Sequence, residues 1–254
     1  MIKLIHGDCL EKMKEIESGS VDMILTDPPY GTTACKWDSI IPLEPMWEQL
    51  KRIIKPNRAI VLTASQPFTT KLISSNYEMF RYCWVWDKSI ATNFMSAKLM
   101  PLLKTEDVCV FSYATANVMS KVKMKYNPQG IKKVNWDVKN SVSVGGKVAK
   151  ERGAVFKGAY KREYTNYPKN IISIPNDKNK LHPTQKPVAL MEYLIKTYTN
   201  EGEAVLDLAM GSGTTGVACK ELNRNFIGIE ISEKYCEISA KRINVEASQG
   251  KLFF

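Results

Sequence analysis

A chain of 254 residues with 44% hydrophobic residues, 24% charged residues and a net charge of +10 has the length and composition of a globular protein. No apolar run reaches membrane-spanning length, and charges interrupt the N-terminus before the apolar region of a signal peptide could form, so we expect a soluble, cytoplasmic protein. The six cysteines form no Cys-x-x-Cys pair, and only His6 and His182 could join them, so we expect reduced thiols and no metal site. Both histidines lack a catalytic partner nearby in sequence and are predicted to be structural.

The positive charge is concentrated in one segment. Residues 116–180 contain fifteen Lys or Arg against four acids, a net of +11, whereas the rest of the chain has a net charge of −1. Such a segment on a near-neutral body is typical of an insertion that binds a polyanion, although a lysine-rich solvated loop would look similar. We expect its aromatic residues to divide between a small core and stacking on bases: Tyr126, Trp136, Phe156, Tyr160, Tyr164 and Tyr167.

Alternating strand and helix patterns run along the remainder of the chain. Seven apolar runs predict strands at residues 1–5, 21–25, 59–63, 79–86, 108–113, 203–208 and 226–229. Helical spacing predicts helices at residues 10–16, 46–54, 188–198 and 235–242, after Pro67 and Gly213, and briefly near residues 96–102. The fold class predicted is therefore α/β, with a seven-stranded, mostly parallel sheet and helices on both faces.

Residues 26–32, Thr-Asp-Pro-Pro-Tyr-Gly-Thr, leave the second of these strands and predict a rigid clamp for an amine. Asp27 supplies a hydrogen-bond acceptor, and Pro28, followed by Pro29, offers a backbone carbonyl on a fixed frame. Tyr30 offers a ring face just beyond them. An Asx-Pro turn that closes a strand is the alternative interpretation. The candidate catalytic residues are Asp27, Pro28, Pro29 and Tyr30.

A second motif lies about 180 residues downstream, where residues 206–215 read Leu-Asp-Leu-Ala-Met-Gly-Ser-Gly-Thr-Thr. Gly211, Gly213 and Gly216 have the spacing of a nucleotide-binding turn, in which the backbone approaches the ligand and a helix N-terminus favours an anionic group. Glu230 follows 23 residues after Asp207, where such folds place the carboxylate that accepts ribose hydroxyls. A ribose with a zwitterionic tail fits S-adenosylmethionine best, and a dinucleotide remains the alternative.

Together these motifs resemble the β-class, or permuted, S-adenosylmethionine-dependent DNA amino-methyltransferases over nearly the whole chain outside the basic segment. The matching stretches, in order, are His6-Gly7-Asp8-Cys9-Leu10, Thr26-Asp27-Pro28-Pro29-Tyr30, Trp86-Asp87-Lys88, His182-Pro183-Thr184-Gln185-Lys186-Pro187, Asp207 to Thr215, and Glu230. The resemblance implies a Rossmann-like methyltransferase fold in circularly permuted order. Residues 1–115 would form the catalytic half, residues 116–180 the basic target-recognition insertion, and residues 181–254 the cofactor-binding half.

The resemblance also assigns the cofactor's contacts. Glu230 would bind its ribose and Asp8 its adenine, while its methionine end would contact Asp207, Gly211, Ser212, Thr214 and Lys186. The full expected set is Asp8, Cys9, Asp27, Thr184, Lys186, Asp207, Ala209, Met210, Gly211, Ser212, Gly213, Thr214, Thr215 and Glu230. The family usually has Pro-Phe where this chain has Leu208-Ala209, so the wall beside the methyl donor is expected to differ. We also expect the strands that carry Asp27 and Asp207 to be neighbours, and Tyr30 and Met210 to face one cleft.

The leading hypothesis is a site-specific DNA methyltransferase that flips an adenine out of the duplex and methylates its N6 amine. Asp27 and the Pro28 carbonyl would each accept an amine hydrogen and turn the nitrogen lone pair towards the sulfonium methyl, while Tyr30 stacks on the base. Cytosine-N4 methylation uses the same geometry, and Asp rather than Ser at the head of the clamp leans towards adenine.

Two further alternatives remain. One is an inactive DNA-binding homologue, and the other is methylation of RNA or a protein amide, where Asn often precedes the two prolines. The expected partner is double-stranded DNA, and the family's many dimers make a homodimer reasonable. Restriction-modification is an expected context, although nothing in the sequence indicates a cognate restriction endonuclease.

Overall fold

The computed structural model describes residues 1–32, 38–115, 120–138, 160–177 and 184–243. It contains two compact units, one formed by residues 1–127 with 170–254 and the other by residues 128–169. The second unit is shorter than the insertion predicted at residues 116–180, because the chain rejoins the main sheet at Ile171. No helix within the described ranges is long and apolar enough to cross a membrane.

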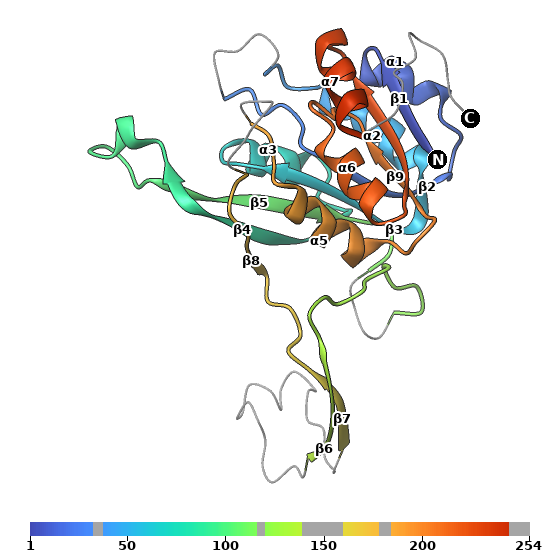
Figure 1. Ribbon diagram of the computed structural model, residues 1–254, viewed down its shortest axis with the longest axis vertical. Coiled ribbons are helices and arrows are strands. Elements are labelled where there is room, and N and C mark those ends of the chain that lie inside the picture. The colour runs from blue at the N-terminus through green and yellow to red at the C-terminus, as the bar shows by residue number, and fades with distance from the viewer. Residues whose placement is uncertain (33–37, 116–119, 139–159, 178–183, 244–254) are drawn as a thin grey trace. The chain divides into compact units, whose positions relative to one another are not determined.

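The first unit is built on an eight-stranded sheet in the order β1-β10-β9-β2-β3-β5-β4-β8 (Figure 1). Neighbouring strands are parallel, except that β5 runs antiparallel to both β3 and β4. All seven predicted strands belong to this sheet, and β8 is the eighth. The strands are β1 (Ile2–His6), β2 (Val21–Thr26), β3 (Ile54–Ala64), β4 (Phe80–Thr92), β5 (Leu103–Phe111), β8 (Ile171–Ser173), β9 (Ala204–Asp207) and β10 (Asn225–Glu230).

Helices cover both faces of the sheet (Figure 1). One face packs against α5 (Val188–Tyr198), α6 (Thr214–Glu221) and α7 (Glu233–Ile243). The other packs against α1 (Cys9–Lys12), the 3₁₀ turn η1 (Met13–Glu15), α2 (Leu43–Ile53) and α3 (Phe68–Ser75). Because Met23 and Leu25 of β2 pack in the first layer and Val21 and Ile24 in the second, the whole strand is buried and reads as a continuous apolar run.

The parallel strands β1, β10, β9, β2 and β3 all end at one edge of the sheet, which we call the carboxyl edge. Met23 and Ile24 of β2 pair with Val205 and Leu206 of β9. This confirms the prediction that the strands leading to Asp27 and Asp207 are neighbours. Segments about 180 residues apart therefore meet at the carboxyl edge, where ligands bind in open α/β sheets.

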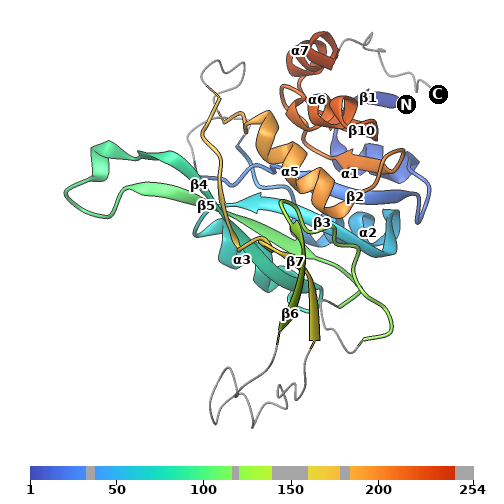
Figure 2. The same ribbon diagram turned by 60° about the horizontal axis from the view of Figure 1, so that its bottom comes forward.

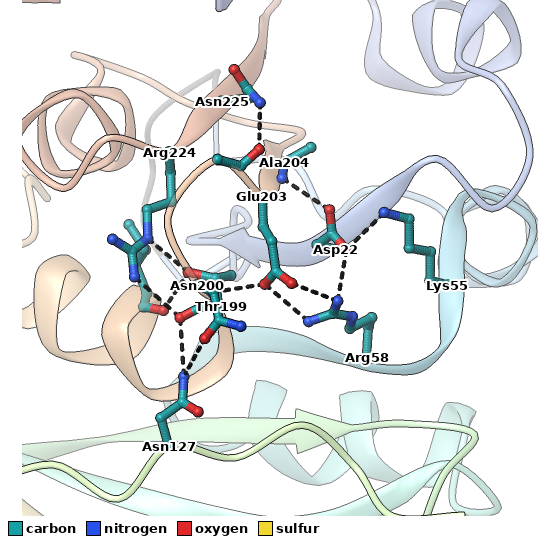
Figure 3. A network of polar contacts seen from close by, with 12 residues as sticks. Asp22, Lys55, Arg58, Asn127, Thr199, Asn200, Glu203, Ala204, Arg224 and Asn225 are labelled. Carbon is teal, nitrogen blue, oxygen red and sulfur yellow. Dashed lines mark hydrogen bonds and ion pairs between the residues drawn. The ribbon is translucent and has the colours of Figure 1, made fainter.

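At the opposite edge of the sheet, a polar network joins the early strands to the start of β9 (Figure 3). Arg58 of β3 donates two hydrogen bonds to Glu203, of 2.9 and 2.6 Å, and its Nη2 lies 3.0 Å from Asp22 Oδ1. Asp22 also lies 2.7 Å from Lys55 Nζ and accepts a 3.0 Å hydrogen bond from the Ala204 amide. The network thereby fixes β2 and β3 against β9 at the end of the sheet far from the carboxyl edge.

The second unit contains an antiparallel pair, β6 (Lys132–Val138) and β7 (Tyr160–Thr165), with Trp136 opposite Arg162. The side chains of Trp136, Tyr164 and Tyr167 are exposed. Phe156 lies outside the described residues. Exposed rings beside basic residues suit stacking on nucleic acid bases, and that role stays a prediction.

Candidate active site

Asp27 directly follows β2 and is held through both of its carboxylate oxygens. Its Oδ1 accepts hydrogen bonds from the Tyr30 hydroxyl, at 2.7 Å, and from the Thr63 hydroxyl near the end of β3. Its Oδ2 lies 2.8 Å from Nζ of Lys186. The carboxylate is therefore oriented in advance of any substrate, which is what an electrostatic catalyst requires. Sequence reasoning missed Thr63, which the pairing of β2 with β3 brings beside Asp27.

Lys186 belongs to a chain of buried charges. Its side chain is 6% exposed, and its Nζ also lies 3.3 Å from Glu106, whose other oxygen lies 3.3 Å from Lys88 Nζ. Burial acts to lower the pKa of Lys186, but attraction to Asp27 and Glu106 outweighs burial, so the pKa is raised and the side chain stays cationic. Glu106 was not predicted, because one acid within a strand gives no periodic signal.

Tyr30 combines a hydrogen-bonded hydroxyl with a partly covered ring. Burial, followed by the charges of Asp27 and Glu106, raises the pKa of Tyr30 well above its usual value, so its hydroxyl remains a donor. The ring stacks on Phe68, with centroids 5.3 Å apart, and Lys186 Nζ lies 5.5 Å from its centroid. A flipped base that stacks on Tyr30 must therefore share the ring with these neighbours.

Asp207 ties the clamp strand to the glycine loop. Its Oδ1 accepts hydrogen bonds from Thr26 Oγ1 at 3.0 Å and from the Ala209 amide at 3.1 Å, and its Oδ2 accepts one from Thr215 Oγ1 at 2.6 Å. Burial raises the pKa of Asp207 to about 7, against the opposing effect of these hydrogen bonds. These three hydrogen bonds use most of the roughly four acceptor positions of a carboxylate that is 3% exposed, and they hold the loop against β2; the contact of Asp207 with the cofactor stays a prediction.

The glycines of the loop have separate structural causes. Gly213 has a φ of +80°, and a Cβ there would lie 2.6 Å from the Cβ of Ser239 on α7. A Cβ on Gly216 would lie 2.3 Å from Cδ1 of Ile243, so this glycine lets α6 pack closely against its neighbours. This division between a tight turn and close packing is that of a nucleotide-binding loop, and it presents the free amides at the start of α6.

Two side chains that were not assigned a role brace this loop from outside. Arg242 Nη1 donates to the Ser212 carbonyl at 2.5 Å, to Ser212 Oγ at 2.9 Å and to Thr214 Oγ1 at 3.2 Å. Ser212 Oγ in turn donates to Gln185 Oε1 at 3.2 Å. Because Gln185 precedes Lys186, this contact couples the glycine loop to the cation that holds Asp27. The sequence placed Arg242 on the last helix but gave no sign of this contact.

Glu230 and Asp8 lie at the ends of the paired strands β10 and β1, where His6 is in register with Glu230. Glu230 accepts hydrogen bonds from the Gly211 and Ser232 amides, both at 2.8 Å, and burial raises its pKa. Asp8 caps α1 by accepting a 2.8 Å hydrogen bond from the Leu10 amide, and its side chain is exposed. Two carboxylates with spare acceptor positions thus flank the same stretch of the carboxyl edge.

Ile231, next to Glu230, is a large apolar side chain exposed at this edge. Its carbonyl lies 3.1 Å from Nε2 of His6, which gives that histidine the structural contact predicted for it. His182 lies outside the described residues. Sequence reasoning missed Ile231, although an exposed apolar residue beside a ribose-type carboxylate offers a surface for a flat base.

Met210 does not lie where predicted. Its side chain is 4% exposed, and its sulfur occupies the space beside Gly228 and lies 3.7 Å from Ser239 Oγ on α7. Tyr30 packs in the layer on the other face of the sheet. The expectation that Tyr30 and Met210 face one cleft is therefore wrong, because the loop turns the Met210 side chain into the core.

The remaining predicted cofactor residues lie at the margins of the site. Thr184 is exposed, two residues before the buried Lys186. Cys9 begins α1 beside Asp8, and burial, followed by the charge of Asp8, raises the pKa of Cys9 to about 11, so its thiol is protonated at neutral pH. Neither residue has chemistry beyond packing or a hydrogen bond to offer at this position.

The geometry brings the predicted amine clamp and the glycine loop together, and comparisons with known proteins give an independent view. A family model for N6/N4 DNA methylases, described as "DNA methylase", matches residues 21–241. Type II methyltransferase M.HpaI of Haemophilus parainfluenzae is 28% identical over 96% of this chain and 74% of its own length. DNA adenine methyltransferase YhdJ of Escherichia coli (strain K12) is 28% identical over 95% of this chain and 82% of its own. The crystal structure of the M1.HpyAVI–SAM complex has a TM-score of 0.63 and 29% identity, over 96% of this chain and 100% of that one.

Proposed function

The chain belongs to the N6/N4 family of DNA methylases, and on that premise we propose that it transfers a methyl group from S-adenosylmethionine to the N6 amine of adenine in double-stranded DNA. One observation carries the proposal. The Thr26 hydroxyl, next to Asp27, donates to Asp207 at 3.0 Å and accepts from the Leu208 amide at 3.0 Å. The amine clamp and the glycine loop are thereby parts of one site.

The residues at the carboxyl edge fit S-adenosylmethionine in their chemistry. Glu230 has acceptor positions left for ribose hydroxyls after its two backbone hydrogen bonds, and Asp8 has an exposed carboxylate for an adenine amine. Ile231 supplies apolar surface for the adenine ring. We assign the methionine carboxylate to the amides of the glycine loop at the start of α6, where the helix dipole favours an anion.

Bound S-adenosylmethionine supplies an electrophilic methyl group, and the chain's own residues prepare the amine to accept it. The lone pair of an adenine amine is delocalised into the ring, which makes it a poor nucleophile. Asp27 and the Pro28 carbonyl each accept one amine hydrogen, which favours sp3 geometry and localises the lone pair. The nitrogen becomes acidic only as the new N–C bond forms, and its proton then passes to the Asp27 carboxylate.

Lys186 has a different place in this mechanism from the one the family resemblance suggested. Its 2.8 Å contact fixes Oδ2 of Asp27, and Oδ1 is left to the neutral donors Tyr30 and Thr63. We propose that Lys186 keeps the Asp27 carboxylate oriented, and that any contact of Lys186 with the cofactor's carboxylate is secondary.

The choice of adenine rests on Asp27 at the head of the clamp, and it is supported by the relative in Escherichia coli that is named an adenine methyltransferase.

Nucleoside analysis tests the choice of adenine. The protein is incubated with methyl-labelled S-adenosylmethionine and plasmid DNA, and the digested DNA is analysed by mass spectrometry. Labelled N6-methyladenine is the expected product. Labelled N4-methylcytosine alone would overturn the adenine assignment, and label only in RNA or protein controls would overturn the DNA substrate.

We infer further that the motif order is permuted, that residues 116–180 read the target sequence, and that the protein acts as a homodimer. The basic charge of that segment and its exposed rings support the second inference. Sequencing of methylated DNA from cells that express the chain would give the recognition site. Sedimentation of the purified protein with and without DNA would test the homodimer, and a monomer mass in both states would contradict it.

A further inference from the structure

The hairpin formed by β4 and β5 projects well beyond the rest of the sheet (Figure 2). Both β3 and β4 are antiparallel to β5, so β4 runs in the same direction as β3 and leaves the sheet at the carboxyl edge. The last register pair of the hairpin is Thr92 with Leu103, five residues beyond Asp87 along β4. These five residues span about 16 Å at ~3.3 Å per residue. Because the DNA major groove is only ~12 Å wide, the hairpin is long enough to reach into a groove.

The tip of this hairpin, residues 90–103, has a defined structure. Thr92 Oγ1 donates to the Leu103 carbonyl at 3.0 Å, and Asn93 turns the chain with a φ of +70°. The 3₁₀ turn η2 (Phe94–Ser96) follows, in place of the short helix predicted near residues 96–102. The amides of Leu99 and Met100 then donate to the Ser96 carbonyl at 2.9 and 3.0 Å. The tip is thus a folded element that can present side chains in fixed directions.

The side chains that the tip presents are large and apolar. Met95 is 99% exposed, Leu99 89% and Phe94 65%. Four more exposed apolar residues surround them: Ile90, Met100, Leu102 and Leu103. A cluster of this size on a soluble surface marks a contact site for another molecule.

The charge of the tip favours a polyanion as that molecule. Residues 89–105 contain no acid and two lysines, Lys98 and Lys104. A nucleic acid backbone would attract such a tip, whereas the basic segment of a second copy, residues 116–180 with a net charge of +11, would repel it.

The base of the hairpin is braced against the catalytic carboxylate. Lys88 on β4 pairs with Glu106 on β5, and Glu106 pairs with Lys186, which in turn holds Asp27. A base that reaches Asp27 must leave its duplex close to this hairpin. The tip and the clamp would therefore contact the same DNA a short distance apart.

We propose that the β4–β5 tip is a DNA wedge whose apolar side chains, above all Phe94, Met95 and Leu99, enter the base stack beside the flipped nucleotide. Phe, Leu and Met are residues that proteins insert between base steps, and flipping a base costs a few kcal/mol that such an insertion offsets. The proposal rests on the DNA substrate proposed above and goes beyond it, because the amine clamp alone gives no means of stabilising the vacated duplex.

Photo-crosslinking tests the wedge directly. A photoreactive amino acid is placed at Met95, and as a matched control at Tyr77, which is 75% exposed and precedes β4 at the far end of that strand. Each protein is irradiated with labelled plasmid DNA and S-adenosylmethionine. We expect covalent DNA adducts from position 95 and none above background from position 77. Equal adducts at both positions, or adducts from position 95 only with a second copy of the chain, would overturn the proposal.

A variant series gives the second measurement. Replacing Phe94, Met95 and Leu99 together by Ser should weaken DNA binding at least tenfold while the affinity for S-adenosylmethionine stays unchanged; Tyr77→Ser should change neither. Unchanged DNA affinity in the triple variant would overturn the wedge.

Methylation of the same plasmid by the unaltered protein is measured in parallel with the crosslinking. Methylation without tip adducts rejects the wedge alone, and tip adducts without methylation reject the proposed activity alone.

Discussion

The ammonium of Lys186 lies 2.8 Å from Oδ2 of Asp27, although 159 residues separate the two in sequence. A second acid, Glu106, lies 3.3 Å from the same ammonium. Because Lys186 is almost fully buried, its charge is stable there only with such partners. The clamp therefore depends on a cation delivered by one part of the chain to a carboxylate delivered by another.

Replacing Asp27 by Ala separates catalysis from folding. Glu106 remains to pair with Lys186, so the buried ammonium keeps one partner and the fold should survive. We expect the single-turnover rate of methyl transfer to fall by at least about a hundredfold, the scale seen when one electrostatic contact to a transition state is removed. The dissociation constants for DNA and S-adenosylmethionine should stay within about threefold of wild type, and loss of binding in proportion to activity would contradict the assigned role.

Glu106→Gln tests the charge beyond Lys186. With a neutral neighbour, Lys186 is drawn fully to Asp27, which makes that carboxylate a poorer acceptor for the amine. We expect kcat to fall about tenfold with the KM for DNA little changed, and Glu106→Asp to restore part of the loss. Glu192→Gln, which breaks a more exposed pair with Lys196, is the matched control and should have wild-type kinetics. A rise in KM alone would assign Glu106 a purely structural role.

The strands and helices could be predicted because burial leaves a periodic trace. All six residues of β2 are buried, and the run from Val21 was recognisable as a central parallel strand. The neighbouring placement of β2 and β9 could also be predicted, from the family resemblance and not from periodicity. Side-chain direction in the loop could not, since Met210 turns into the core because of local backbone geometry that residue type does not reveal.

The charge chain and the hairpin were outside the reach of sequence reasoning. Glu106 and Lys88 lie on different strands, and their pairing depends on the register of β4 with β5. The hairpin's exposed apolar tip was predicted to contain a short helix, because an apolar run does not show whether a partner covers it. Sites assembled from several strands thus become visible only once the register is known.

The pKa of Asp207 gives a pH signature. Burial raises this pKa from 3.8 to about 7. Between these two pH values the carboxyl of Asp207 is protonated in the folded protein and ionised in the unfolded chain. The folded state then binds more protons between about pH 4 and 7, and the contribution of Asp207 to the free energy of unfolding falls as the pH rises through that range. Carboxyl-carbon NMR should show one aspartate that titrates near pH 7 and disappears in Asp207→Asn. A midpoint near pH 4 for that resonance would contradict the effect of burial.

The basic strands of the second unit predict salt-dependent DNA binding. Lys132 and Lys133 on β6 are exposed, and each phosphate contact they make should release counterions. Replacing both by Gln should lower the slope of log K against log salt by about two, at roughly 0.9 per contact. Replacing Lys14 and Lys196 by Gln is the control and should leave the slope unchanged, because these lysines already pair with the nearby acids Glu11 and Glu192. An unaltered slope in the first variant would remove β6 from the DNA interface.

Arg58→Met tests the network at the edge opposite the site (Figure 3). The change removes both hydrogen bonds to Glu203 and the contact with Asp22, while Asp22 keeps Lys55. Since breaking a largely buried pair leaves an uncompensated charge, we expect the free energy of unfolding in urea to fall by about 3 kcal/mol.

The double variant Arg58→Met with Glu203→Met should recover much of that loss in stability, because neither charge is then left without a partner. Lys14→Met, which breaks an exposed pair with Glu11, should cost less than about 0.5 kcal/mol. If Arg58→Met is as mild as Lys14→Met, this network does not hold β2 and β3 against β9.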